Sequence, residues 1–343
     1  MRLLDDSLRL AICQEGRAID VLCIGNALVD RLAEGDEAVV RAAGLEVGAM
    51  TLVDPDQAAV IESARDHWRE VAGGSAANTA AGIASLGRRP AFVGTVGDDQ
   101  AGRRYVADLE AIGVQAYVHI ADHLPTGLCH VLVSPSGERS MATSLGAAGA
   151  LDERAVAEAG IGSASIIYLE GYLLDAPAAG PALERAIELA RSSETLVALS
   201  LSDPFVVERH HDKIDELLSA GLVDLLFGNA EEVCSLTGHD SLEQAVDSLW
   251  EKDRLAFVTK GAAGSMALAG EVRVQQPAHG VEAVVDTTGA GDLFAAGVLG
   301  GLCAGQDVAQ SLRLGSLAAA EIISHLGARP EASLAELARH ELG

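Results

Sequence analysis

Short apolar runs alternate with longer helical patterns along most of the chain. The first run, residues 19–25 (IDVLCIG), predicts a buried strand that ends in a tight turn. Similar runs predict further strands at 91–95, 114–120, 127–133, 166–169, 196–201, 223–227 and 255–259. Apolar residues at helical spacing predict helices at 75–86, 101–112, 178–191, 241–252, 290–303 and 308–325.

This alternation predicts one α/β domain over residues 19–343, with a mostly parallel central sheet covered by helices on both faces. Two segments, at approximately 31–53 and 114–146, do not follow the alternation. We interpret them as a small accessory β element that acts as a lid. Residues 1–18 precede the first strand and are interpreted as an N-terminal extension.

The composition indicates an aliphatic core and an acidic surface. Hydrophobic residues make up 49% of the 343 residues but aromatic residues only 3%, so Ala, Val, Leu and Ile must build the core. The net charge of −26 disfavours nucleic acid and anionic membranes as partners. No apolar run reaches the roughly 18 residues of a membrane span. Five cysteines without a C-x-x-C pair predict free thiols in a reducing cytosol, and hence a cytoplasmic protein.

The clearest chemical signal is the run Val285-Asp-Thr-Thr-Gly-Ala-Gly-Asp292, directly before an apolar helix. A helix N-terminus presents unpaired N–H groups, and glycines let a phosphate approach that backbone closely. An aspartate in the first turn, Asp292, can accept a proton from a substrate hydroxyl beside the bound anion. The run therefore indicates phosphoryl transfer, with a glycine-rich turn before an ordinary helix as the alternative.

Two further runs supply candidate contacts to a substrate. Gly25-Asn-Ala-Leu-Val-Asp30 follows the first strand, and open α/β sheets bind ligands at the carboxyl ends of their strands. The carboxylate of Asp30 suits the two hydroxyls of a sugar or ribose. Ala72-Gly-Gly-Ser-Ala-Ala-Asn78 opens a helix, where its paired glycines allow close approach of a ligand. An ordinary turn and a capped helix start are the alternative interpretations.

The run Phe227-Gly-Asn-Ala-Glu-Glu232 is a candidate metal site at a strand end. Asn229 and Glu232 can jointly hold the waters around Mg²⁺, because this ion keeps much of its hydration shell. A capping box at a helix start would use the same two residues.

The run Val258-Thr-Lys-Gly-Ala-Ala-Gly-Ser265 also follows a predicted strand. It can place Thr259 and Gly261 at a nucleotide, or it can form a β-turn between two strands. Other nucleotide-binding templates are absent: the sequence has no Walker loop, no G-x-G-x-x-G after the first strand and no protein-kinase motifs.

Taken together and in this order, the runs resemble the PfkB/ribokinase family of carbohydrate and nucleoside kinases, over roughly residues 19–330. The most specific parts are GGSAANTA, which begins at Gly73, and DTTGAGD, which begins at Asp286. The resemblance implies a ribokinase-like three-layer α/β/α fold, ATP as the phosphate donor and Mg²⁺ as a cofactor. It leaves open whether a monovalent cation is required.

The resemblance also implies roles for individual residues. It makes Asp292 the catalytic base and the backbone of Gly289, Ala290 and Gly291 the anion hole. The implied substrate contacts are Asn26, Leu28, Asp30, Gly73, Gly74 and Asn78. The implied nucleotide contacts are Asn229, Thr259, Lys260, Gly261 and Gly264, with Asn229 and Glu232 holding Mg²⁺ through water.

Within the family, the chain is most similar to adenosine kinases and their bacterial relatives. Gly137-Glu-Arg-Ser140 is similar to their lid strand and implies that Arg139 lies near the transferred phosphate. Leu201-Ser-Asp-Pro-Phe205 is similar to another of their runs and implies that Leu28 and Phe205 lie near the nucleobase. Tyr172-Leu173 stands where those kinases usually have an aromatic pair, so Tyr172 is the candidate for stacking on the base.

The resulting prediction is an ATP-dependent kinase that phosphorylates the primary hydroxyl of a nucleoside, foremost adenosine to AMP. A ribokinase-like or fructokinase-like sugar kinase remains an alternative, because few aromatic residues are available for base stacking. A non-catalytic ligand-binding relative is a further alternative, which the intact catalytic runs disfavour. The expected partner is a small-molecule substrate, and the chain is expected to be a monomer or a homodimer.

Overall fold

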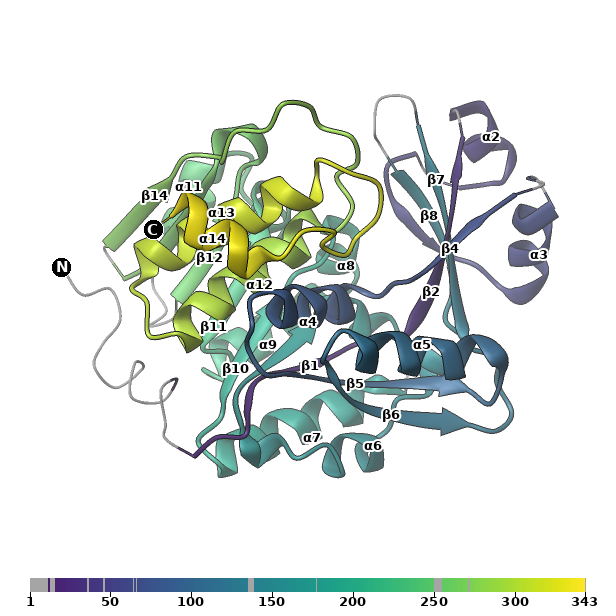
Figure 1. Ribbon diagram of the computed structural model, residues 1–343, viewed down its shortest axis with the longest axis horizontal. Coiled ribbons are helices and arrows are strands. Elements are labelled where there is room, and N and C mark those ends of the chain that lie inside the picture. Colours follow the sequence, from purple (N-terminus) through teal and green to yellow (C-terminus); the bar gives the residue numbers. More distant parts are fainter. Residues whose placement is uncertain are drawn as a thin grey trace.

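The computed structural model describes residues 12, 16–35, 37–45, 47–63, 65, 67–134, 139–176, 178–249, 255–270 and 272–342. These residues form two β-sheets, a large one of nine strands and a small one of five (Figure 1). Most of the predicted N-terminal extension, residues 1–18, lies outside the described residues, as do Gly137 and Glu138.

The large sheet is mostly parallel, with the strand order β14-β13-β12-β11-β10-β9-β1-β5-β6. Only its last two pairings, β12 with β13 and β13 with β14, are antiparallel. The strands are β1 (Ile19–Ile24), β5 (Pro90–Gly97), β6 (Gln115–Ala121), β9 (Ala164–Glu170), β10 (Leu196–Ser200), β11 (Leu225–Asn229), β12 (Leu255–Thr259), β13 (Ser265–Ala269) and β14 (Val272–Gln276).

Helices cover both faces of this sheet, which confirms the predicted three-layer α/β fold (Figure 1). Alternate residues of β1 point into two separate cores: Leu22 and Ile24 into one, Val21 and Cys23 into the other. The first core is closed by α6 (Glu153–Ala157), α7 (Ala179–Ser192), α8 (Pro204–Arg209), α9 (His211–Ser219), α10 (Ala230–Thr237) and α11 (Leu242–Leu249). The second is closed by α4 (Ser75–Ser85), α5 (Gln100–Ala111), α12 (Ala290–Cys303), α13 (Val308–Ile322) and α14 (Leu334–Glu341).

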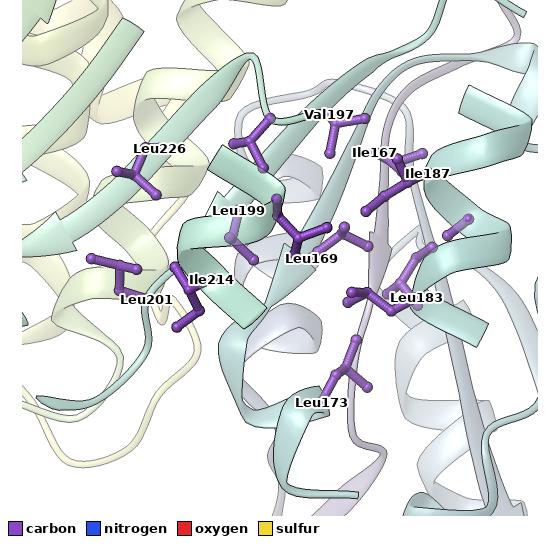
Figure 2. Close-up of a cluster of buried hydrophobic side chains, with 14 of the residues drawn as sticks. Ile167, Leu169, Leu173, Leu183, Ile187, Val197, Leu199, Leu201, Ile214 and Leu226 are labelled. Carbon is purple, nitrogen blue, oxygen red and sulfur yellow. The ribbon is translucent and has the colours of Figure 1, made fainter. Parts of the chain in front are cut away.

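Aliphatic side chains fill the first core, as the low aromatic content predicts. Figure 2 shows Leu183 and Ile187 of α7 against Ile167 and Leu169 of β9. The spacing of Leu183 and Ile187 places both on one face of α7, and all four residues are at most 3% exposed.

None of the described helices is both long and apolar enough to cross a membrane.

The small sheet has the order β3-β8-β7-β2-β4 and projects beside the large one (Figure 1). Its strands are β2 (Leu28–Glu34), β3 (Met50–Leu52), β4 (Arg69–Ala72), β7 (Gly127–Val133) and β8 (Arg139–Ser144). Two helices, α2 (Glu37–Ala42) and α3 (Pro55–Ser63), cover its outer face. A separate apolar cluster lies between them, with Val40 and Ile61 against Leu132 and Ala142.

The sequence-predicted lid segments, 31–53 and 114–146, differ from this small sheet in two respects. The strand at 115–121, β6, is an edge strand of the large sheet and pairs in parallel with β5. The strand at 69–72, β4, belongs to the small sheet but was not predicted. An edge strand is half exposed, as a lid strand would be, so the polarity of 115–121 does not distinguish the two sheets.

We predict that truncation of the buried α7 side chain Ile187 destabilises the protein strongly. Ile187→Ala should lower the free energy of unfolding by about 2–5 kcal/mol, because it leaves a cavity in a closely packed core. Ile120→Ala, at a site that is 57% exposed, is the matched control and should change it by less than about 1 kcal/mol. Urea denaturation of both variants measures the difference, and equal effects would contradict the packing described here.

Candidate active site

A cavity of about 490 Å³ lies between the inner face of the small sheet and the carboxyl ends of the large-sheet strands. Most of the sequence-predicted site residues line it together. They are Asn26, Leu28, Asp30, Gly74, Asn78, Arg139, Tyr172, Asn229, Glu232, Thr259, Gly261, Gly289, Ala290, Gly291 and Asp292. Four other predicted residues are not among the lining residues: Gly73, Phe205, Lys260 and Gly264.

The glycine-rich run forms the N-terminus of α12, as the sequence predicts. Gly289 is the N-cap residue and has a left-handed backbone, with φ 74°. Asp286, three residues before Gly289, is fully buried, and its hydrogen bonds fix the loop that leads into α12. One oxygen of Asp286 accepts hydrogen bonds from the backbone and hydroxyl of Thr288, and the other accepts from the backbone of Gly327 at 3.0 Å. The first N–H groups of α12 therefore face the cavity from a rigid loop.

The carboxylate of Asp292 is held by the first turn of α4. Ser75 Oγ donates to one oxygen at 2.7 Å, and Asn78 Nδ2 donates to the other at 2.9 Å. Burial raises the pKa of Asp292 above its usual value, although these two hydrogen bonds and the charge of Arg139 oppose the rise. Asn78 is thus a positioning partner of Asp292, and only its Oδ1 stays without a hydrogen-bond partner among the described residues.

Asp30 enters the cavity from β2 and lies against the paired glycines. A Cβ atom on Gly73 would lie 2.2 Å from the Asp30 carboxylate, so no side chain fits there. Gly73 therefore acts behind the cavity wall, by letting Asp30 approach the turn. Burial raises the pKa of Asp30 to about 7, while the guanidinium groups of Arg139 and Arg329 oppose the rise.

Another buried carboxylate, Glu170, was not predicted from the sequence. It stands at the end of β9, lines the cavity and is 1% exposed. One oxygen accepts from the backbone N–H of Asn26 at 2.7 Å, and the other accepts from that of Ala76 at 2.8 Å. Burial raises the pKa of Glu170 to about 7. Glu170 thereby fixes the turn after β1 relative to the start of α4.

Arg139 reaches the cavity from β8. Its Nε lies 3.5 Å from Asp286 Oδ1, and its side chain is 17% exposed. Among the described residues that line the cavity it is the only lysine or arginine, whereas five carboxylates do so: Asp30, Glu170, Asp175, Glu232 and Asp292. A bound phosphate would therefore meet Arg139 and the α12 N-terminus in otherwise acidic surroundings.

Asn229 and Glu232 form the capping box that the sequence offered as an alternative to a metal site. Asn229 Nδ2 donates to Glu232 Oε1 at 2.6 Å, and the backbone N–H of Glu232 donates to Asn229 Oδ1 at 2.9 Å. Burial raises the pKa of Glu232 to about 7. No group of three His, Cys, Asp or Glu residues suited to a metal occurs in the described part of the chain. The carboxylate of Glu232 has lone pairs left that can accept hydrogen bonds from Mg²⁺-bound water. Asn229 and Glu232 alone do not provide a complete set of direct Mg²⁺ ligands.

The remaining predicted residues divide between the cavity and its surroundings. Tyr172 lines the cavity, and its hydroxyl donates to Ser202 O at 3.3 Å. Phe205 is 40% exposed on α8 and is not among the residues that line the cavity. Lys260 Nζ donates to Gln275 at 3.0 Å. Gly264 has φ 88° in the turn before β13, where a Cβ would lie 2.1 Å from Gln276 O.

The small sheet, with the residue that follows β8, gives the cavity an apolar wall, of which only Leu28 was predicted from the sequence. The wall consists of Leu28, Met50, Leu52, Met141 and Leu145. Met50 and Met141 are neighbours in register on β3 and β8, so their side chains project from the same face of the sheet. Sequence pattern alone did not reveal this wall, because the register between distant strands decides which residues share a face.

Comparisons with known proteins agree with this geometry. The pfkB family of carbohydrate kinases matches residues 47–334. The structure of an adenosine kinase from Sinorhizobium meliloti is 40% identical and superposes with a TM-score of 0.91, covering 94% of this chain and 99% of that one. An adenosine kinase of Schizophyllum commune is 29% identical, covering 90% of this chain and 95% of its own length.

A relative with a different acceptor is almost as similar. A 5-dehydro-2-deoxygluconokinase of Shouchella clausii is 28% identical, over 94% of this chain and 96% of its own length. These relatives share a kinase activity but differ in substrate. With a match that spans most of its length and a site of the expected geometry, the chain belongs to the pfkB family of carbohydrate kinases and is an ATP-dependent phosphotransferase.

Proposed function

We propose that the phosphate acceptor is a nucleoside, foremost adenosine, phosphorylated at its primary hydroxyl to give AMP. The observation that carries this proposal is that the cavity lining combines a set of polar residues, here called the polar floor, with the apolar wall. A nucleoside combines the same two parts, because a ribose with three hydroxyls is joined to a flat and largely apolar base.

The polar floor is suited to hydroxyl groups. The buried oxygens Asn26 Oδ1 and Asn78 Oδ1 accept no hydrogen bond from any described residue. A buried acceptor without a partner is costly, so these atoms favour a ligand that donates. The carboxylate of Asp30 adds a third acceptor, which can take two hydroxyls at once. Together they fit the hydroxyls of a ribose ring.

The apolar wall is suited to a base. Leu28, Met50, Leu52 and Met141 line the cavity from the small sheet, and the thioether side chains of the two methionines adapt well to a flat ring. Tyr172 supplies an aromatic ring at the edge of the cavity. The adenosine kinase names of the Sinorhizobium meliloti and Schizophyllum commune relatives agree with this assignment.

In the proposed mechanism, Asp292 removes the proton from the primary hydroxyl as its oxygen attacks the γ-phosphorus of ATP, the bond to the bridging oxygen breaks and ADP leaves. Ser75 and Asn78 hold the carboxylate in place for this step. The N–H groups at Gly289, Ala290 and Gly291, together with Arg139, stabilise the charge that develops on the transferred group. Mg²⁺, when bound, neutralises phosphate charge, and Glu232 with Asn229 would hold it through water.

A simple sugar or sugar acid is the second candidate acceptor. The position of Phe205 outside the cavity favours it, because this removes one of the two predicted aromatic contacts to a base. The similarity to the Shouchella clausii 5-dehydro-2-deoxygluconokinase agrees with it as well. The polar floor would serve either class of acceptor, so the apolar wall distinguishes the two.

We predict that adenosine is the preferred acceptor in an assay of ADP release with Mg·ATP. Adenosine should give a higher kcat/KM than other nucleosides, ribose, fructose or 5-dehydro-2-deoxygluconate, because only a nucleoside fills both parts of the cavity. Asp292→Asn is the enzyme control and should lose about 10²–10⁴-fold in kcat while it stays folded. A free sugar or sugar acid as the best acceptor would contradict the nucleoside assignment, and normal turnover by Asp292→Asn would contradict the mechanism.

We predict that Asp30→Asn stabilises the free protein at pH 8 more than at pH 5. The pKa of Asp30 is about 7 in the folded protein and about 4 in the unfolded chain, so folding takes up a proton between these pH values. The charge on Asp30 therefore lowers the free energy of unfolding by up to about 4 kcal/mol as pH rises from about 4 to 7, and the uncharged variant avoids this contribution.

Urea denaturation of wild-type protein and Asp30→Asn at both pH values measures the effect. The control variant is Asp98→Asn, at an exposed site with only a surface ion pair to Arg103, and it should change the free energy of unfolding by less than about 1 kcal/mol. A stability difference for Asp30→Asn that is the same at pH 5 and pH 8 would show that Asp30 is not destabilised by burial.

A further inference from the structure

The connection from the large sheet to the small sheet, between β6 and β7, is held in a fixed position, and we call it the crossing. Strand β7 lies in the middle of the order β3-β8-β7-β2-β4, and it follows β6, an edge strand of the large sheet. The connection ends at Thr126, directly before β7, and Thr126 is 4% exposed. Contacts that hold Thr126 in place therefore also hold the start of β7, the strand with which both β2 and β8 pair.

Asp99, at the start of α5, holds this crossing. One of its oxygens, Oδ2, accepts from the backbone N–H of Thr126 at 2.8 Å. The other, Oδ1, accepts from the Thr126 hydroxyl at 2.6 Å and from the backbone N–H of Gly102 at 2.7 Å. Gly97, the last residue of β5, donates its N–H to the Thr126 hydroxyl at 3.1 Å. Asp99 thus caps α5 and ties the small sheet to the large one.

The backbone of Gly97 lies so close to that of residues 124–126 that no side chain fits between them. A Cβ atom on Gly97 would lie 2.4 Å from Leu124 O and 2.7 Å from Thr126 N. The segment that leaves the small sheet after β8 is held at the same place, because the backbone N–H of Ala147 donates to Pro125 O at 2.8 Å. Hydrogen bonds from Thr126 and Gly102 hold the pKa of Asp99 below its ordinary value despite burial, so Asp99 anchors the crossing as a charged acceptor at neutral pH.

The position of two cavity residues depends on β7. Asp30 on β2 pairs in register with Cys129, and Arg139 on β8 pairs with Val133 at the far end of β7. The seven residues of β7 extend about 23 Å at about 3.3 Å per residue. A tilt of about 2.5° at Thr126 therefore displaces Arg139 by about 1 Å, which is enough to cost about 10²-fold in rate.

We propose that Asp99 is a positioning residue for phosphoryl transfer, which acts through Thr126 and β7 to place Asp30 and Arg139 over the cavity. Asp99 does not line the cavity and touches no substrate. The inference rests on the proposed function, because it takes Asp30 and Arg139 as contacts to the acceptor and the transferred phosphate.

Asp99→Asn tests this link while it keeps the helix cap. An asparagine at position 99 can still accept from Gly102 N, but its amide meets the Thr126 N–H donor to donor. We expect kcat/KM for the acceptor to fall about 10- to 100-fold, with the KM for ATP changed less than about 2-fold. The matched control is Asp98→Asn, which removes only a surface ion pair with Arg103 and should behave as wild type.

Thr126→Val and Thr126→Ser provide a second pair, in case Asp99→Asn folds poorly. Valine removes the hydroxyl between Asp99 and Gly97 and should reproduce the loss, whereas serine keeps it and should restore at least half of the wild-type kcat/KM. Variants that fold but retain the acceptor kcat/KM of wild type would overturn the proposal. So would a rise in the KM for ATP as large as the fall in kcat/KM for the acceptor, which would indicate general disruption of the site.

Hydrogen exchange of the free protein separates this inference from the proposed function. Asp99→Asn should speed exchange in β2 and β8 at least 5-fold and leave α12 unchanged, whether or not adenosine is the acceptor. Unchanged exchange in β2 and β8 would overturn the anchor even if adenosine is phosphorylated. Absence of phosphorylation by the wild-type protein would refute the proposed function and leave the exchange result as the test of the anchor.

Discussion

The hydrogen bonds from α4 to Asp292 are the interaction on which the rest of the site depends. Two helix N-termini meet at this carboxylate: α12 carries it, and the first turn of α4 donates to it through Ser75 and Asn78. The two helices pack closely through small residues, and a Cβ atom on Gly82 would lie 2.6 Å from that of Ala296. The helix packing and the orientation of the proposed base are therefore one structural feature, in which charge is stabilised by fixed dipoles.

The same arrangement is costly for the free protein. Burial raises the pKa values of Asp30, Glu170 and Glu232 to about 7, in a chain that already carries a net charge of −26. Acids in this state weaken the fold and repel an anionic substrate. All three line the cavity, and the oxygens of Glu170 are already hydrogen-bonded there by the backbone of Asn26 and Ala76.

The sequence predicted the residues that local chemistry marks. Asp292 and Asn78 meet in the cavity because the starts of α12 and α4 gather at one edge of the parallel sheet, and Asp30 joins them from β2 of the small sheet. Glu170 was missed because its partners, the N–H groups of Asn26 and Ala76, lie 144 and 94 residues away in the chain.

Similar limits apply to the sheets and to the base pocket. The pairing of β6 with β5, and the register that places Met50 beside Met141, depend on contacts between distant strands. The placement of Phe205 outside the cavity depends on the direction of α8, which the run Leu201-Ser-Asp-Pro-Phe205 does not encode. The cytoplasmic location, the oligomeric state and any need for a monovalent cation stay predictions from sequence.

The most direct test of the central role of Asp292 is the pH profile of the single-turnover rate with adenosine. Its acid limb, where the rate falls at low pH, is compared between the wild-type protein and Ser75→Ala. The hydrogen bond from Ser75 lowers the pKa of Asp292, so its removal should raise that pKa. The account predicts that the limb moves to higher pH, because a hydrogen bond to the charged carboxylate is lost. An acid limb at the same pH in both proteins would show that a group other than Asp292 takes the proton.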